Sequence, residues 1–376
     1  MPSMPFPARS ALLAALVAVA SLPPPAVGAE ARAPSPALTP AESAAAASDY
    51  QRYCALCHGA DREGHANDAA PSLKSRSLLE SGWPRSIHHA ISYGRPGTPM
   101  GGYLDEVGGP MSAADLVRLT RWLGEAGGVA PLTMSPEPVA GDPARGAVVY
   151  ATRCASCHGA DGEGGEGTAL GNAAMLALES DAFLRHAIVE GRQGTPMPSF
   201  AGTLDDTAID DVVAFVRSRA AGWKQPEPAA VPPPLDALVL NPGAPAPDFE
   251  LQADLYVSVA QLRRELDAGR EMVLIDTRVP SVWRHGHIRG AMPLPYYSGA
   301  EVLAKLPRDG TWIVAYCECP RAAAEFLVRK LRAEGIVSSA VLYEGFQGWL
   351  AGGHPIVTGA TPDGDGAEAR SPPHAH

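Results

Sequence analysis

The sequence predicts a multidomain protein in which two all-α domains precede an α/β domain with a parallel sheet. Three observations indicate this fold class. The chain has 376 residues, more than the roughly 100 to 200 residues of one typical domain. Two short sequence blocks each occur twice, in the same order, before residue 225. Strand-like and helix-like segments then alternate towards the C-terminus, which is typical of a parallel sheet.

Composition and charge exclude some classes of protein. The 41 acidic and 30 basic residues give a net charge of −11. This charge repels a phosphate backbone, so we expect no nucleic-acid partner. The 39 glycines and 37 prolines are too few for disorder throughout the chain and favour folded modules joined by stiff linkers.

The N-terminus has the pattern of a secretory signal peptide over residues 1–29. An apolar run at residues 11–22 follows Arg9, and small residues occupy positions 26–29. We expect cleavage near Ala29 and a periplasmic protein. The run is shorter than the ~20 residues that a membrane-spanning helix needs, so we expect no stable membrane insertion.

The two recurring blocks indicate a duplicated module. The first is Cys54-Ala55-Leu56-Cys57-His58-Gly59, which recurs as Cys154-Ala155-Ser156-Cys157-His158-Gly159. The second is Gly94-Arg95-Pro96-Gly97-Thr98-Pro99-Met100, which recurs as Gly191-Arg192-Gln193-Gly194-Thr195-Pro196-Met197. Each copy ends in an amphipathic helical pattern, at residues 112–125 and 205–219. We therefore expect one domain at residues 44–128 and another at 140–222.

The Cys-x-x-Cys-His pattern is typical of covalent haem attachment. Each of two thiols one helical turn apart adds to a vinyl group, and the adjacent histidine ligates the iron. A redox dithiol or half of a zinc site would use the same cysteine spacing. However, neither repeat has a second cysteine pair, and no βαβ pattern surrounds the motif. We therefore expect two covalently attached haem c groups, held by Cys54, Cys57, His58, Cys154, Cys157 and His158.

The second block supplies a candidate for the other axial ligand. Met100 and Met197 each follow a proline in a non-helical loop, and thioether ligation raises the reduction potential of a haem. Met111 also follows a proline but has no counterpart in the second repeat. His89 and His186 occupy equivalent positions in helical segments, where packing or a propionate contact is the favoured role.

Each repeat resembles a class I cytochrome c domain, and the resemblance covers about residues 44–225. It implies an N-terminal helix that carries the haem motif, a methionine loop and a C-terminal helix. It also implies His58 and His158 as proximal ligands, and Met100 and Met197 as distal ligands.

The last third of the chain has a different pattern. A proline-rich stretch at residues 223–250 is typical of a semi-extended linker. Beyond it, strands are predicted at residues 272–275, 312–316 and 340–342, with a helix at 322–333. We expect this α/β domain to span residues 252–358, followed by a flexible tail at 359–376.

The order of short blocks in this domain resembles the rhodanese family. The blocks are residues 275–278, 286–291, 316–317, 344–349 and 353–355. The resemblance implies that Cys317 is the sulfur-carrying nucleophile of a sulfurtransferase, with Asp276 and Arg278 as framework residues. A helix that begins just beyond Cys317 would favour a thiolate or persulfide there.

The active loop departs from the rhodanese pattern. Arg321 arrives one residue early, and the loop contains Cys319 and Pro320, which has no backbone N–H to donate. Two interpretations remain open. Cys319 could resolve a persulfide on Cys317 by thiol exchange. Alternatively, the two cysteines form a disulfide in an oxidising compartment and the domain only docks a partner.

These features support three functional hypotheses. In the first, the chain carries single electrons between periplasmic redox proteins, such as a dehydrogenase, an oxidase or a small cytochrome. In the second, the C-terminal domain also binds or oxidises a small reduced sulfur compound, so the chain has sulfurtransferase or sulfur-oxidising activity. In the third, the C-terminal domain is inactive and serves as an adapter. Fold alone does not choose among them.

Overall fold

The structure is a computed structural model that describes residues 37–67, 69–224, 238–318 and 321–365. The expected signal peptide and Cys319 lie outside these ranges. Within these ranges, none of the helices is both long enough and apolar enough to cross a membrane.

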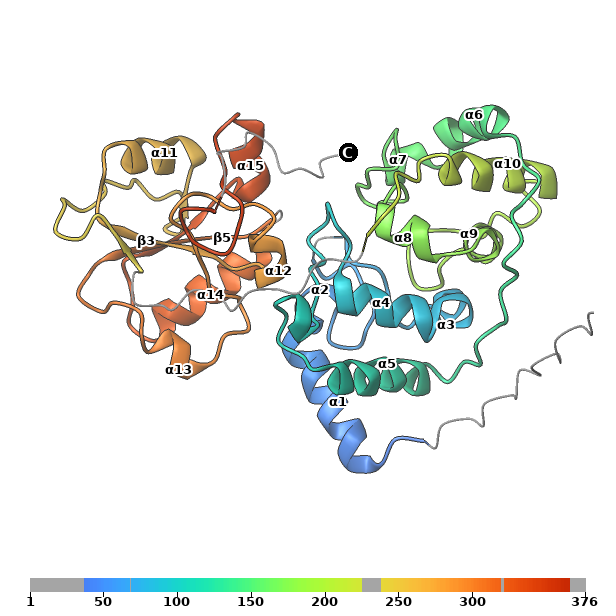
Figure 1. The fold of residues 1–376 in the computed structure, drawn as a ribbon, viewed down its shortest axis with the longest axis horizontal. Helices are drawn as coiled ribbons and strands as arrows, with labels where there is room; N and C mark the ends of the chain where they lie inside the picture. Colours follow the sequence, from blue (N-terminus) through green and yellow to red (C-terminus); the bar gives the residue numbers. More distant parts are fainter. Residues whose placement is uncertain (1–36, 68, 225–237, 319–320, 366–376) are drawn as a thin grey trace, which may run out of the picture. The chain divides into compact units, whose positions relative to one another are not determined.

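The described residues between 37 and 224 form an all-α part of the chain (Figure 1). The first repeat contains α1 (Pro40–Tyr53), α2 (Ala55–His58), α3 (Arg76–Gly82), α4 (Arg85–Tyr93), the 3₁₀ helix η1 (Asp105–Val107) and α5 (Ala113–Gly127). The second contains α6 (Pro143–Arg153), α7 (Ala155–His158), α8 (Ala173–Leu178), α9 (Asp181–Glu190) and α10 (Asp206–Arg217).

Side-chain caps fix where the terminal helices begin. Ser112 caps α5 in a capping box with Asp115, and Asp205 accepts a hydrogen bond from the Ala208 N–H at the start of α10. These bonds satisfy backbone donors that a helix leaves without partners in its first turn. The helices predicted at residues 112–125 and 205–219 are therefore present with nearly the expected bounds.

The first and last helices of each repeat pack against each other, α1 on α5 and α6 on α10. The closer pair is α6 and α10, where Gly146 faces the backbone of α10. A Cβ at this position would overlap the Asp211 carbonyl oxygen and lie 2.9 Å from the Cβ of Phe215. The first repeat has Ala46, fully buried, at the equivalent position. The second repeat therefore depends on a glycine at its helix crossing.

The C-terminal part is an α/β domain with a six-stranded sheet. Its strands are β1 (Val239–Leu240), β2 (Tyr256–Val257), β3 (Met272–Asp276), β4 (Met292–Pro293), β5 (Trp312–Tyr316) and β6 (Ser339–Leu342). The order is β1-β3-β5-β6-β2, with β4 paired to β3. All pairs are parallel except β1 with β3. The predicted parallel sheet is therefore mixed, although mostly parallel.

Helices cover both faces of this sheet (Figure 1). One face packs on α13 (Ala300–Leu303) and α14 (Ala322–Ala333), and the other on α11 (Val259–Asp267) and α15 (Gly345–Ala351). The short helix α12 (Pro280–Trp283) follows β3. Side chains along β3 and β5 alternate between the two faces, and both faces are buried. Such strands read as continuous apolar runs, which explains why the sequence located them.

The boundaries of the α/β domain differ from the expected ones. β1 lies within residues 223–250, the range expected to be linker. Val239 of β1 pairs with Val273 of β3, so this segment belongs to the sheet. At the other end, the Gly290 N–H donates to Pro362 O at 2.7 Å, so the start of the expected tail contacts the domain.

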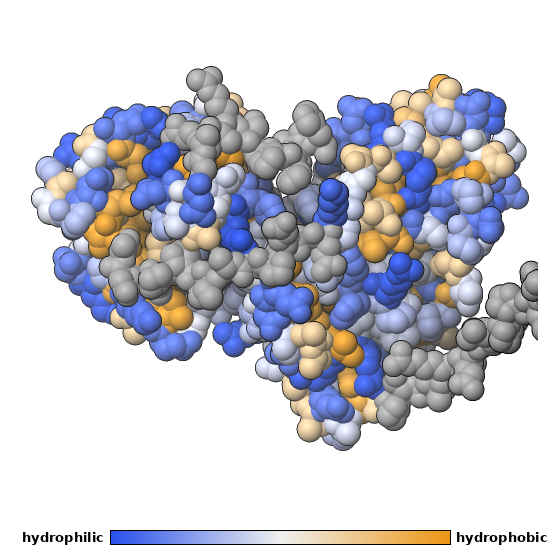
Figure 2. All heavy atoms as spheres, viewed as in Figure 1, coloured by the Kyte–Doolittle hydropathy of each residue, from blue (hydrophilic) through white to orange (hydrophobic). Residues whose placement is uncertain are grey.

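Hydrophilic residues cover much of the visible face of the molecule, with smaller hydrophobic patches between them (Figure 2). The large apolar side chains that are exposed among the described residues are Val117, Leu132, Val148, Phe326, Val337 and Tyr343.

Candidate functional site

The Cys-x-x-Cys-His motif of each repeat occupies one helical turn after a break in the first long helix. Cys54 ends α1 with φ −121° and ψ −36°, and its carbonyl accepts from the His58 N–H at 2.9 Å. Cys154 has nearly the same backbone angles, φ −121° and ψ −38°. The tyrosine hydroxyls of Tyr50 and Tyr150 donate to the carbonyls of Gly59 and Gly159 and fix each turn. The two cysteines of each motif are therefore one turn apart, as thioether attachment requires.

The histidine of each motif is oriented by a backbone carbonyl. His58 Nδ1 lies 2.8 Å from Pro71 O, and His158 Nδ1 lies 2.8 Å from Thr168 O. A carbonyl only accepts, so Nδ1 carries the proton and Nε2 keeps a lone pair for a metal. Burial lowers the pKa of both imidazoles, which favours this neutral form.

The methionine loops of the two repeats have the same internal hydrogen bonds. The hydroxyls of Thr98 and Thr195 each accept from the methionine N–H at 3.2 Å. The same hydroxyls donate at 2.7 Å to the carbonyls of Arg95 and Arg192. Gly97 and Gly194 supply the positive φ angles, +77° and +78°, that this turn requires. Both loops therefore hold their methionine in the same local conformation.

One cavity of about 480 Å³ is lined by the motif cysteines and histidines, by Met100 and by Met197. Most of its wall is apolar, with contributions such as Leu78, Ile91, Leu184 and Val213. Two buried polar atoms at this cavity, Arg95 Nη1 and Glu179 Oε1, have no hydrogen-bond partner among the described residues. An apolar cavity with thiol, imidazole and thioether donors, and with a buried guanidinium N–H that lacks an acceptor, fits haem c.

The two repeats contact each other at equivalent positions. Asn172, which caps α8, donates to Pro96 O in the first methionine loop at 2.7 Å. Ser75 is the residue before α3, and its hydroxyl donates at 3.3 Å to Oε1 of Gln193 in the second loop. Each methionine loop is therefore held by the other repeat as well as by its own.

The alternative axial ligands lie away from this cavity. Met111 is 2% exposed and packs in the core of the first repeat. His89 packs against the rings of Tyr93 and Trp223 in tilted and edge-on arrangements, with ring centroids 4.7 and 4.8 Å away. His186 Nε2 lies 3.4 Å from a carboxylate oxygen of Glu80. None of the three lines the cavity, which supports packing roles for them.

The zinc alternative lacks a ligand set. Nowhere in the described ranges do three or more His, Cys, Asp or Glu side chains gather closely enough to hold a metal ion.

In the α/β domain, Cys317 lies directly beyond the carboxyl end of β5 and is 5% exposed. Its carbonyl accepts from the Phe346 N–H at 2.9 Å. Gly345 has φ +61°, and a Cβ there would lie 3.0 Å from the same carbonyl oxygen. The start of α15 therefore fixes the backbone of the cysteine loop. Cys319 and Pro320, the other predicted loop residues, lie outside the described ranges.

Arg278 joins two carboxylates beneath this loop. It contacts Asp276 at 2.6 Å and Glu318 at 2.6 Å, and its guanidinium stacks on Phe346 at 3.9 Å. Burial by itself would lower the pKa of Arg278, but the two carboxylates raise it well above its usual value. Arg321 stacks on Tyr343 at 4.3 Å and donates to the carbonyl of the same residue at 3.1 Å. Among the described residues, Arg278 and Arg321 therefore each contact other side chains or carbonyl groups.

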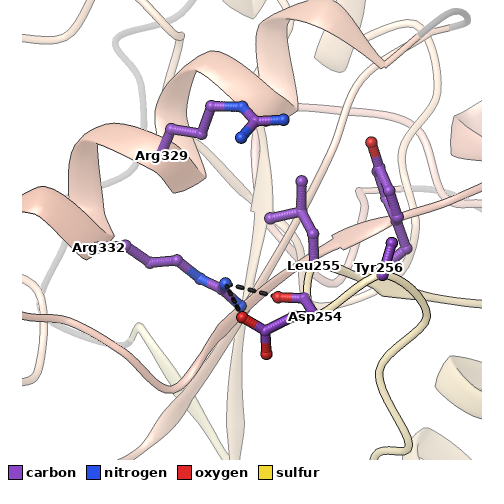
Figure 3. Close-up of a pocket in the computed structure, with 6 residues that line it drawn as sticks. Asp254, Leu255, Tyr256, Arg329 and Arg332 are labelled. Atoms are coloured by element: carbon purple, nitrogen blue, oxygen red, sulfur yellow. Dashed lines mark hydrogen bonds and ion pairs between the residues drawn. The ribbon is translucent and has the colours of Figure 1, made fainter.

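A second, smaller pocket of about 240 Å³ lies between α14 and the turn before β2 (Figure 3). Arg332 donates to Asp254 O at 2.6 Å and so closes one side of it. The lining is Ala253, Asp254, Leu255, Tyr256, Arg329 and Arg332. This pocket does not include Cys317 and is separate from the cysteine loop.

Comparison with known proteins identifies the all-α part. The family model described as cytochrome C oxidase, cbb3-type, subunit III matches residues 41–123 and 141–216. Cytochrome c6 of Thermosynechococcus vestitus is 35% identical over 100 residues, which cover 24% of this chain and 84% of that protein. The chain belongs to the cytochrome c family. Membership of this family implies covalently bound haem c.

Longer relatives cover both repeats of the cytochrome. The cbb3-type cytochrome c oxidase subunit FixP of Rhizobium meliloti is 30% identical over 185 residues, 47% of this chain and 61% of that subunit. The chain spans between 57% and 61% of the length of its FixP relatives.

The C-terminal part of the cytochrome is a rhodanese-like domain, since that family model matches residues 258–352. The probable adenylyltransferase/sulfurtransferase MoeZ of Mycobacterium tuberculosis is 38% identical over 95 residues, 25% of this chain and 24% of that protein.

The cavity lined by both Cys-x-x-Cys-His motifs, Met100 and Met197 is called the haem cavity. Sequence reasoning did not single out its charged residues. Arg95 and Arg192 were visible in the recurring block, and their repetition was the available signal. Glu179 gave no such signal, because the equivalent residue of the first repeat is Gly82. Glu318 also gave no signal in the sequence, since only the fold brings it to Arg278.

Proposed function

We propose that this cytochrome is a periplasmic dihaem carrier of single electrons, whose rhodanese-like domain links it to reduced sulfur compounds. The observation that carries the proposal is the repetition of a complete donor set. Each repeat presents two cysteines, a histidine with its Nε2 available and a methionine to the same apolar cavity. The export of the chain rests on the signal-like pattern of residues 1–29.

Each donor has a distinct role in this proposal. Cys54, Cys57, Cys154 and Cys157 would hold the two haem groups by thioether bonds. His58 and His158 would ligate the iron through Nε2, and Met100 and Met197 through their thioether sulfur. Haem c, when bound, supplies an iron that accepts and releases one electron. The apolar walls exclude water, which favours the less charged reduced state and so raises the reduction potential.

Cys317 is the proposed site of sulfur chemistry. Its thiol and a hydrosulfide ion would join in a sulfur–sulfur bond, giving a persulfide on Cys317 and releasing two electrons and two protons. Haem c at the two motifs would supply the one-electron acceptors for this oxidation, and the protons would go to solvent. The positive end of the helix α14, which begins at Ala322, would favour the anionic persulfide. The resolving role of Cys319 stays a prediction.

Addition of sulfur compounds to the oxidised protein tests this link. Sulfide, thiosulfate and a small-molecule persulfide are mixed separately with the ferric cytochrome, and the haem absorption band is followed in time. We expect at least one compound to reduce the haem groups, and Cys317→Ser to abolish that reduction. Glu325→Gln, on α14, is a control that leaves Cys317 in place. Reduction that survives Cys317→Ser would contradict the sulfur link.

The low exposure of Cys317, at 5%, favours a second candidate function. In it, the rhodanese-like domain is catalytically inactive and docks a redox partner such as a dehydrogenase or oxidase. This function predicts that Cys317→Ser leaves electron transfer to a copurified partner unchanged.

A further inference from the structure

Three charged side chains from both repeats line the haem cavity, where Glu179 is buried and the two arginines are half-buried. Arg95 comes from the first methionine loop and Arg192 from the second, at equivalent positions. Glu179 follows α8 of the second repeat. All three line the cavity, and Glu179 is 6% exposed.

The Glu179 carboxylate is held by the first repeat. The Ser86 hydroxyl donates to its Oε2, and Arg95 Nη2 lies 3.7 Å from its Oε1. Arg192 Nη1 donates to the Ser77 hydroxyl at 3.1 Å, which anchors that guanidinium to the first repeat as well. The carboxylate is thus fixed between the two repeats and cannot turn out to solvent without breaking these contacts.

The charges of this cluster do not balance. Two guanidinium groups face one carboxylate, and Arg95 Nη1 is buried without a hydrogen-bond partner among the described residues. Burying an unpaired charge costs free energy, so anions bound in the cavity would stabilise the two guanidinium groups. Haem brings such anions as its propionate carboxylates. Arg95 and Arg192 therefore fit propionates, and Glu179 would share these two cations with them.

The environment of Glu179 raises the pKa of its carboxyl above the ordinary value. Burial raises its pKa, whereas the Ser86 hydrogen bond and the charges of Arg95, Arg192 and Arg85 oppose the rise. Of the neighbouring charges, Asp181 is paired with Arg217 at 2.8 Å, and Arg217 Nη2 donates to the Glu179 backbone carbonyl at 2.7 Å. Each haem reduction would add one negative charge to this low-dielectric cavity and so favour a neutral carboxyl group.

We propose that Glu179 is a proton-binding site that couples electron uptake at the haem cavity to proton uptake from solvent. The inference rests on the proposed function, because it needs haem at both motifs of this cavity. With haem bound, one-electron reduction at the cavity would be accompanied by one proton that moves from solvent to a Glu179 carboxylate oxygen and gives a neutral carboxyl. When the electron leaves, that O–H bond breaks and the proton returns to solvent.

Spectroelectrochemical titration of the purified full-length protein between about pH 5 and pH 9 tests this coupling. In wild type, at least one midpoint potential is expected to fall as pH rises. The limit is about 59 mV for each tenfold change in proton concentration, since one electron is coupled to one proton. Glu179→Gln should remove this slope. Glu190 is an exposed carboxylate on α9. The control variant Glu190→Gln should retain the slope.

A second variant keeps the carboxyl group in place. Ser86→Ala removes a hydrogen bond that favours the ionised form, so the pH-dependent region should move to higher pH. An unchanged profile in Ser86→Ala, or the same slope in folded, haem-loaded Glu179→Gln as in wild type, would overturn the inference. Haem-loaded wild type with pH-independent potentials would refute the inference alone, whereas protein without haem would refute the proposed function too.

Discussion

The glycine at the helix crossing of the second repeat offers a quantitative test of the fold around the haem motif. In Gly146→Ala, the added methyl would overlap the Asp211 carbonyl oxygen and press on the Phe215 Cβ at 2.9 Å. Overpacking against backbone costs about 3 kcal/mol, and the better helix propensity of alanine returns about 1 kcal/mol. The net loss is about 2 kcal/mol, which corresponds to roughly 30-fold more frequent opening of this helix pair.

Native-state hydrogen exchange measures that opening segment by segment. Peptides from α6 and α10 should exchange faster in Gly146→Ala, while peptides from α1 and α5 report the unchanged first repeat in the same sample. Ala46→Gly is the matched control, because it should accelerate exchange only in α1 and α5. Unchanged or slower exchange in α6 and α10 of Gly146→Ala would refute the close crossing.

Three further substitutions separate the roles of buried groups. Met197→Ala should change the visible spectrum and lower one haem potential, and an unchanged spectrum would exclude this ligand. Met111→Ala should leave both spectra intact and cost about 2 to 5 kcal/mol of stability, measured by urea unfolding, because it leaves a cavity in the core. Arg278→Gln should destabilise the rhodanese-like domain by about 3 to 5 kcal/mol, since it leaves carboxylates unpaired; a loss below 1 kcal/mol would contradict that reasoning.

Sequence patterns located the elements whose register is set by burial. The strand at residues 312–316 and the helix at 322–333 have the expected bounds. The strand is buried almost throughout and reads as an uninterrupted apolar run, while the helix has one buried face. In contrast, β1, β2 and β4 have two residues each. Such short strands form only through pairing with strands distant in the sequence, so no local sequence pattern predicts them.

The candidate haem residues were visible because each belongs to a motif that occurs twice. The structure brings the motif cysteines, His58, His158, Met100 and Met197 to one cavity, and their assignment as ligands stays a prediction. Glu179 could not be found in this way, since its partners Ser86 and Arg95 belong to the other repeat. Polar contacts between separate parts of a chain have no spacing rule in the sequence.

The number of haem groups per chain tests the central claim most directly. Intact mass spectrometry of the denatured, exported protein counts covalently attached haem, and the reduced haem spectrum gives an independent ratio. Two haem groups are expected in the wild type, with Cys157→Ser losing stable attachment at the second motif and keeping the first. A wild-type chain that carries one haem, or none, after export with a working haem-attachment system would contradict the account.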